Sequence, residues 1–120
     1  MANALIVDDS GSMRQMISFT LTQAGHKVTE AVDGDDALKV VSKSAFDLII
    51  SDINMPNMDG ITLVAEIRKL ASYKFTPILL LTTESAVDKK KQGKAAGATG
   101  WLVKPFNPEQ LIATVTKVLG

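Results

Sequence analysis

The rest of the chain is organised around the sequence FDLIISDINMPNMDG, residues Phe46–Gly60. Its apolar first part, Phe46–Ser51, is typical of a short buried strand. The strand pattern ends at a carboxylate, Asp52, and a loop rich in Asn, Pro and Asp then leads to Gly60, where a helical pattern begins. This order predicts that a buried strand carries Asp52 to the open end of a sheet.

Four further strand patterns alternate with helical patterns along the chain. The five predicted strands are Ala4–Val7, Lys27–Ala31, Phe46–Ser51, Pro77–Leu81 and Thr99–Val103. A helical pattern follows each strand, and the fourth, Val87–Ala96, is the weakest because lysines and a glycine interrupt its apolar face. Alternating strands and helices predict an α/β domain with a parallel sheet covered on both faces.

The polarity of the five strands predicts their order in the sheet. Strands one, three and four are nearly all apolar, as interior strands of a parallel sheet are. Strands two and five carry polar residues and therefore suit the edges. The order 2-1-3-4-5 meets this requirement, and it is that of the flavodoxin-like doubly wound (βα)5 fold.

Composition excludes several classes of protein. The 120 residues predict one domain, 1–120, without a linker or an output domain. Lysines and arginines number 13, as do acidic residues, so there is no basic footprint for nucleic acid or an anionic membrane. There are no cysteines for disulfides or thiolate metal sites. We expect a cytoplasmic protein without membrane insertion, because the sequence shows no signal peptide and no apolar run of the required ~20 residues.

Right-handed crossovers place the carboxyl ends of all five strands at one edge of the sheet. The side chains predicted to meet there are Asp8, Asp9, Asp52, Thr82 and Lys104. Three clustered carboxylates would repel one another unless a cation joined them, and the single ammonium of Lys104 leaves a net charge that a divalent cation would neutralise. Oxygen ligands without cysteine favour Mg²⁺, Mn²⁺ or Ca²⁺, and Mg²⁺ fits best because it takes one or two carboxylates together with phosphate oxygens.

These groups are suited to phosphoryl transfer. A carboxylate beside Mg²⁺ can act as a nucleophile toward phosphorus, which would leave an acyl phosphate on Asp52. Catalysis of such a step is mostly positioning and charge stabilisation. The Thr82 hydroxyl and the Lys104 ammonium could each take one phosphoryl oxygen.

Four motifs along the chain carry a resemblance to a known family. They are IVDDS (Ile6–Ser10), SDINMPNMDG (Ser51–Gly60), LLTTE (Leu80–Glu84) and WLVKPF (Trp101–Phe106). In this order and spacing they resemble the receiver domains of two-component response regulators, above all the stand-alone receivers of chemotaxis. The resemblance covers the entire chain.

The resemblance implies specific roles around the acidic site. Asp52 would be the phosphoacceptor, phosphorylated by a sensor histidine kinase such as a chemotaxis kinase. Asp9 and Asp52 would bind Mg²⁺ directly, Asp8 would assist largely through water, and Asn54 would contribute its backbone carbonyl. Asn54 and Glu84 would also flank the acyl phosphate and influence its lifetime.

The resemblance also implies a conformational switch. Lys104 would pair with the phosphoryl group, and its peptide bond to Pro105 would be cis. Thr82 would move toward the phosphoryl oxygen, and the switch aromatic on the fifth strand would turn inward into the vacated space. That aromatic is usually tyrosine in chemotaxis regulators, whereas this chain has Trp101.

The resulting hypothesis is a signalling protein and not an enzyme with turnover. It would catalyse only its own phosphorylation and autodephosphorylation, and its further partners would be a downstream target, such as a flagellar motor switch component, and a phosphatase.

The sequence leaves two alternative functions open. An FMN carrier on the same fold would need an uncharged phosphate-binding loop where Asp8 and Asp9 stand, and an aspartyl-phosphate phosphohydrolase would usually carry a D-x-D motif and a cap domain. Thr82 could instead cap a helix, and Lys104 could be a solvated loop residue.

Overall fold

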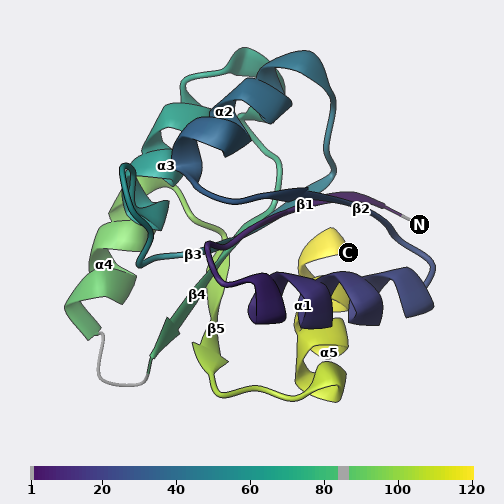
Figure 1. The fold of residues 1–120 in the computed structure, drawn as a ribbon. Coiled ribbons are helices and arrows are strands. Elements are labelled where there is room, and N and C mark those ends of the chain that lie inside the picture. Colours follow the sequence, from purple (N-terminus) through teal and green to yellow (C-terminus); the bar gives the residue numbers. More distant parts are fainter. Residues whose placement is uncertain (1, 84–86) are drawn as a thin grey trace.

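The structure, a computed structural model, describes residues 2–83 and 87–120. Its strands are β1 (Asn3–Val7), β2 (Lys27–Ala31), β3 (Leu48–Asp52), β4 (Ile78–Thr83) and β5 (Gly100–Lys104). All neighbouring strands pair in parallel, and the order is β2-β1-β3-β4-β5 (Figure 1). The predicted order, with the two polar strands at the edges, is confirmed. The third strand begins later than predicted, at Leu48, and includes Asp52 as its last residue.

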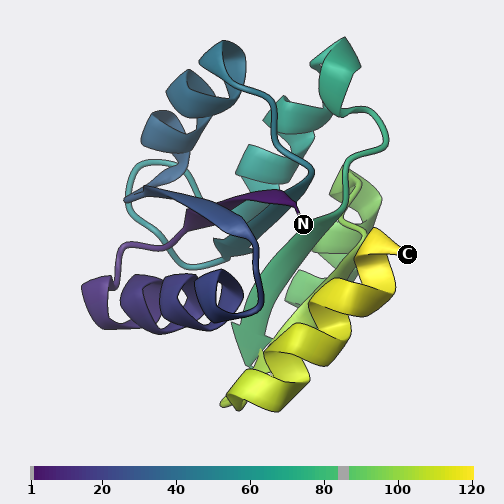
Figure 2. The same cartoon turned by 90° about the vertical axis from the view of Figure 1, so that its right-hand side faces the viewer.

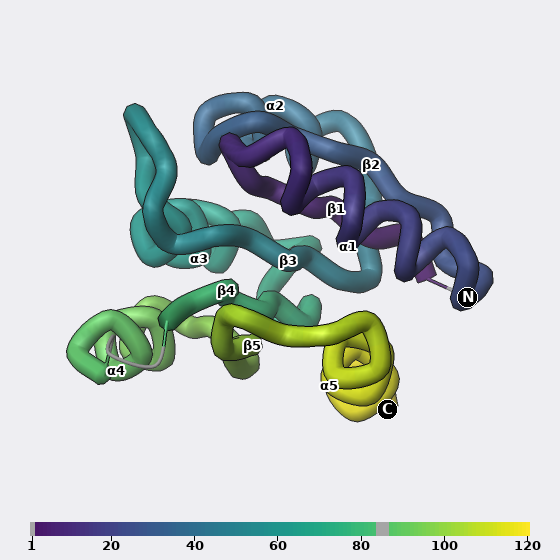
Figure 3. Tube along the Cα trace, turned by 60° about the horizontal axis from the view of Figure 1, so that its bottom comes forward, coloured from purple at the N-terminus to yellow at the C-terminus, as the bar shows by residue number. Residues whose placement is uncertain are grey.

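Helices cover both faces of this sheet. They are α1 (Gly11–Gln23), α2 (Gly34–Lys43), α3 (Gly60–Arg68), α4 (Val87–Ala96) and α5 (Pro108–Leu119), with a short 3₁₀ turn η1 (Ala71–Tyr73) after α3. Helices α1 and α5 lie on one face, as Figure 2 shows, and α2, α3 and α4 lie on the other. Seen from another side, β4 and β5 run between α4 and α5 (Figure 3). None of the helices in the described residues is long and apolar enough to cross a membrane.

Local sequence fixes where most helices begin. The side-chain oxygens of four N-cap residues accept hydrogen bonds from backbone N–H groups three residues further on. These caps are Ser10, Asp33, Asp59 and Asn107. Asp33 follows β2 closely, and Ser10 follows β1 after two acids. The turns from β1 to α1 and from β2 to α2 are therefore short.

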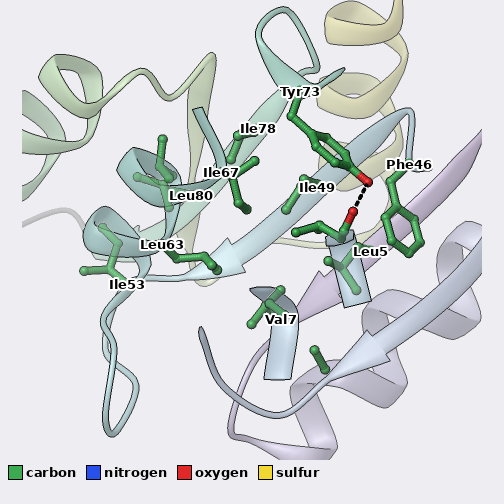
Figure 4. Close-up of a cluster of buried hydrophobic side chains, with 14 residues drawn as sticks. Leu5, Val7, Phe46, Ile49, Ile53, Leu63, Ile67, Tyr73, Ile78 and Leu80 are labelled. Carbon is green, nitrogen blue, oxygen red and sulfur yellow. Dashed lines mark hydrogen bonds between the residues drawn. The ribbon is translucent and has the colours of Figure 1, made fainter. Parts of the chain in front are cut away.

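Two apolar layers hold the helices on the sheet. Within β3, the fully buried Ile49 faces the α2–α3 side and the fully buried Ile50 faces the α1–α5 side. Figure 4 shows the first layer, in which the buried Tyr73 hydroxyl donates a hydrogen bond to the Val41 carbonyl at 3.0 Å. Since both faces of β3 are buried, its direction is rigidly set, and so is the position of the carboxylate at its end.

Candidate functional site

Three carboxylates meet at the carboxyl ends of the two central strands. Asp8 and Asp9 follow β1, and Asp52 ends β3. One carboxylate oxygen from each residue lies within 4.8 Å of the corresponding oxygens of the other two. Asp8 and Asp52 are buried, whereas Asp9 is exposed. The structure thus brings together the three acids that the topology predicts to meet.

Asp52 is held from two directions. Its Oδ1 atom accepts a hydrogen bond from the Ile53 backbone N–H at 2.9 Å and from the Lys104 ammonium at 3.0 Å. Lys104 ends β5, two strands away in the sheet, and its side chain is 27% exposed. No described residue donates a hydrogen bond to the second oxygen, Oδ2. The described residues therefore orient the carboxylate through Oδ1.

Gly60 allows the loop after β3 to return to the strand end. Its N–H donates to the Ile53 carbonyl at 2.9 Å, which brings the start of α3 against Asp52. A Cβ atom at position 60 would lie 2.1 Å from the Asp52 carbonyl oxygen, a distance that no side chain could occupy. The glycine at the end of the opening motif is thus a steric requirement of the site.

Of the three acids, Asp8 has the least favourable electrostatic environment for a charged carboxylate. It is fully buried, and one oxygen accepts a hydrogen bond from the Ser10 N–H at 2.9 Å. The other oxygen, Oδ2, is buried and has no hydrogen-bond partner among the described residues. Burial raises the pKa of the Asp8 carboxyl, and the negative charge of Asp52 adds to this effect. An unpaired buried oxygen beside two further carboxylates fits a hard divalent cation such as Mg²⁺.

Thr82 and Trp101 lie on the same face of adjacent strands. Thr82 pairs with Val103 and Leu80 pairs with Trp101, so the two side chains are two positions apart in register. The Thr82 hydroxyl is buried, and its one hydrogen bond within the described part of the chain is a long one, 3.4 Å, which it donates to the Thr83 carbonyl. Trp101 is half-buried against the core on this face.

The remaining predicted residues surround this arrangement. Asn54 is exposed in the loop after Asp52. The Lys104–Pro105 peptide bond is cis, the geometry that the family resemblance implies. Glu84 lies outside the described residues.

Sequence reasoning missed one residue next to the site. The Arg14 guanidinium donates to the Asp8 backbone carbonyl at 2.7 Å. Its target is a backbone atom, so no pattern of side chains predicts the contact. The one weak signal in the sequence is the position of Arg14 near the start of a predicted helix, where a cation opposes the helix dipole and therefore needs another reason to be there.

Comparisons with known proteins agree with this geometry. Residues 4–116 match the family model of the response regulator receiver domain. The chemotaxis protein CheY homolog of Campylobacter jejuni is 39% identical over 118 residues, which cover 97% of this chain and 91% of that protein. The response regulator protein FleR of Pseudomonas aeruginosa is 39% identical over 116 residues, but the chain spans only 24% of its length. Among solved structures, chemotaxis response regulator CheY4 of Vibrio cholerae is 58% identical with a TM-score of 0.94, and the match covers 98% of both chains.

Proposed function

The chain belongs to the family of response regulator receiver domains, and we propose that it is a phosphorylation-activated switch whose phosphoacceptor is Asp52. The observation that carries the proposal is the state of this carboxylate. It is 7% exposed, ion-paired to Lys104 at 3.0 Å and clustered with Asp8 and Asp9 at the end of the central strand. A nucleophile, a counter-cation and two further acids at one sheet edge suit phosphoryl acceptance.

The proposed reaction transfers a phosphoryl group from a phosphohistidine of a sensor histidine kinase. The Asp52 oxygen Oδ2, to which no described residue donates a hydrogen bond, attacks phosphorus, so that an O–P bond forms as the N–P bond breaks. The bonding electrons leave with the histidine nitrogen, which takes up a proton. Ile53 and Lys104 hold the other carboxylate oxygen, and this fixes the direction of attack.

Asp8, Asp9 and Asp52 are the residues that would hold Mg²⁺, with the backbone carbonyl of Asn54 as a further ligand. The unpaired buried oxygen of Asp8 supports this assignment. When bound, the cation would neutralise charge on the transferring phosphoryl oxygens. Mn²⁺ would suit the same oxygen ligands.

Lys104 and Thr82 are the proposed partners of the phosphoryl group. The Lys104 ammonium is already within hydrogen-bond distance of Asp52, so a short movement would bring it to a phosphoryl oxygen. The long hydrogen bond of the Thr82 hydroxyl is weak and easily exchanged for one to a charged oxygen. Movement of Thr82 would open space on the face that it shares with Trp101, which would then turn inward.

Partners and pathway follow from the family. We propose a histidine kinase as the donor, and a chemotaxis pathway because relatives covering nearly the whole chain are named CheY. The target would be a protein such as a flagellar motor switch component, and a phosphatase would end the signal. The chain would act once per phosphorylation and not as an enzyme with turnover. Asn54 and Glu84 would set the lifetime of the acyl phosphate.

A mass measurement tests the proposal. The protein is incubated with Mg²⁺ and a small acyl phosphate donor, and intact mass is recorded for wild type and Asp52→Asn. We expect one added phosphoryl group on wild type that depends on Mg²⁺, and none on Asp52→Asn, which preserves the shape of the side chain but removes the nucleophile. An unmodified wild-type protein, or an Asp52→Asn variant modified to the same extent, would refute the assignment.

A further inference from the structure

Arg14 connects the acidic loop to an edge strand of the sheet. It is the fourth residue of α1, and its Nη1 atom donates to the Asp8 carbonyl at 2.7 Å. Its Nε atom donates to Glu30 Oε1, on β2, at 3.2 Å. A single side chain thus links the start of α1, the loop that carries the acids, and β2.

The position of Arg14 is electrostatically unfavourable for the helix alone. A cation near the amino end opposes the helix dipole, and α1 has no acidic residue in its first turn to compensate. The Arg14 side chain is only 19% exposed, so its two hydrogen-bond partners replace much of its hydration. The stability of α1 therefore does not explain an arginine here, whereas orientation of the neighbouring loop does.

The Arg14 contact completes a restraint on the Asp8 backbone. The Asp8 N–H donates to the Ala31 carbonyl at 3.2 Å, and the Asp8 carbonyl accepts from Arg14. This carbonyl shares a rigid peptide plane with the Asp9 N–H, so the bond fixes the plane from which Asp9 projects. No hydrogen bond or ion pair from the described residues holds the exposed Asp9 carboxylate itself.

Glu30 makes this restraint compatible with a cation site. An unpaired guanidinium next to Asp8 would repel a divalent cation. The ion pair with Glu30 balances the charge of Arg14, so what remains near the site is a directional hydrogen bond. Glu30 also holds the guanidinium from its Nε edge, which leaves Nη1 directed at the Asp8 carbonyl.

We propose that Arg14 is a positioning residue for divalent-cation binding. Through the Asp8 carbonyl it orients the carboxylates of Asp8 and Asp9, and Glu30 keeps its guanidinium in place. The inference rests on the proposed function, since it requires that these acids bind Mg²⁺.

Calorimetric titration with Mg²⁺ tests the role of Arg14. We expect Arg14→Met to raise the Kd for Mg²⁺ about tenfold, the usual effect of removing a group that orients metal ligands. Arg14→Lys keeps one hydrogen-bond donor, so its Kd for Mg²⁺ should lie between those of wild type and Arg14→Met. Lys39→Met removes the same charge from an exposed position on α2 and should keep the wild-type Kd. A wild-type Kd for Arg14→Met, or an equal loss in Lys39→Met, would overturn the inference.

Rate measurements separate positioning from general damage. If Arg14 only positions cation ligands, the phosphorylation rate of Arg14→Met should approach that of wild type at saturating Mg²⁺, while the Mg²⁺ concentration at half-maximal rate rises. A maximal rate that stays low at saturating Mg²⁺ would argue against a positioning role.

A second variant covers the case in which Arg14→Met does not fold. Glu30 is 42% exposed at the sheet edge, and Glu30→Leu keeps Arg14 but removes both the anchor and the counter-charge of its guanidinium. We expect a smaller rise in Kd in the same direction, and an unchanged Kd would overturn the proposed pair. A wild-type protein that binds no Mg²⁺ would refute the proposed function itself, whereas wild-type binding with an unaffected Arg14→Met variant would refute this inference alone.

Discussion

At Asp8, the requirements of folding and of function conflict. The carboxyl is fully buried with one oxygen unpaired among the described residues, and burial raises its pKa. A raised pKa means that the folded state binds the Asp8 proton more tightly than the unfolded chain does. The stabilising contribution is therefore present at pH values below the ordinary pKa of 3.8 and is lost as the pH rises through the raised value. Ionisation of the buried Asp8 carboxyl as the pH rises therefore destabilises the metal-free fold.

We therefore predict that Asp8→Asn stabilises the metal-free protein at neutral pH. The free energy of unfolding should rise by on the order of 1 kcal/mol, because a neutral amide replaces an unpaired buried charge. Urea unfolding without divalent cations measures this. Asp35→Asn, the same substitution at an exposed position in the first turn of α2, should instead lower stability slightly. Excess Mg²⁺ should stabilise wild type more than Asp8→Asn, and a lower stability of Asp8→Asn in metal-free buffer would contradict the prediction.

Residues at strand ends were predictable, and residues that bind backbone were not. Asp52 and Lys104 each end a strand pattern, so the parallel topology alone placed them at one edge. Arg14 donates to the Asp8 carbonyl, a group that every residue has, so sequence does not identify this partner. The sequence does not give the register between β4 and β5, and this register is what places Thr82 close to Trp101.

Among the elements, α4 depends most on tertiary contacts. Its sequence contains adjacent lysines and an interior glycine, which weaken a helix, yet Val87–Ala96 is helical as predicted. Gly93 lies so close to β4 that a Cβ atom there would be 2.6 Å from Leu80 Cδ1. The helix is thus held by close approach to the sheet and not by an apolar stripe of its own.

Arg68 anchors the carboxyl end of α4. Its Nε atom donates to the Gly97 carbonyl at 2.9 Å, just beyond the helix. Its Nη1 atom donates to the carbonyls of Tyr73 at 2.6 Å and Thr76 at 2.7 Å, in the segment before β4. One guanidinium therefore ties α3, the approach to β4 and the end of α4 together.

We predict that Arg68→Met destabilises the fold by about 2–4 kcal/mol, since several charge-assisted hydrogen bonds to backbone are lost together. Hydrogen exchange should show the largest loss of protection in α4 and in the segment before β4. Lys69→Met is the matched control, because among the described residues the Lys69 side chain forms an exposed ion pair with Glu66 alone, and its loss should cost about 0.5 kcal/mol or less. Equal effects of the two substitutions in urea unfolding would show that the Arg68 network contributes little.

Across the whole molecule, the sheet has one fixed end and one end that carries the acidic cluster. At the fixed end, the Thr99 hydroxyl oxygen accepts a hydrogen bond from the Ile78 N–H at 3.0 Å, which joins the starts of β4 and β5. At the opposite end the same two strands carry Thr82 and Lys104 near Asp52. Chain-wide features such as strand polarity sufficed to predict this arrangement, because burial on both faces leaves little freedom for the order of the strands. A change at Asp52, the proposed phosphoacceptor, should therefore be transmitted through the carboxyl ends of β4 and β5.

Trp101 is the only tryptophan in the chain, so its fluorescence should report this transmission. Phosphorylation should change Trp101 fluorescence in wild type, because it should shift the protein from one conformer to another. A shift from 1:99 to 99:1 between two conformers requires about 5.5 kcal/mol, and several charge-assisted hydrogen bonds to a phosphoryl group can supply this free energy. Thr82→Val keeps the shape of the side chain but removes the hydroxyl. We expect it to be phosphorylated, as seen by intact mass, while most of the fluorescence change is lost. The Asp52→Asn variant should show neither modification nor fluorescence change. If Thr82→Val were phosphorylated and kept the full fluorescence change, the Thr82 hydroxyl would not couple the phosphoacceptor to Trp101, and the signal would have to pass through Lys104 and β5 instead.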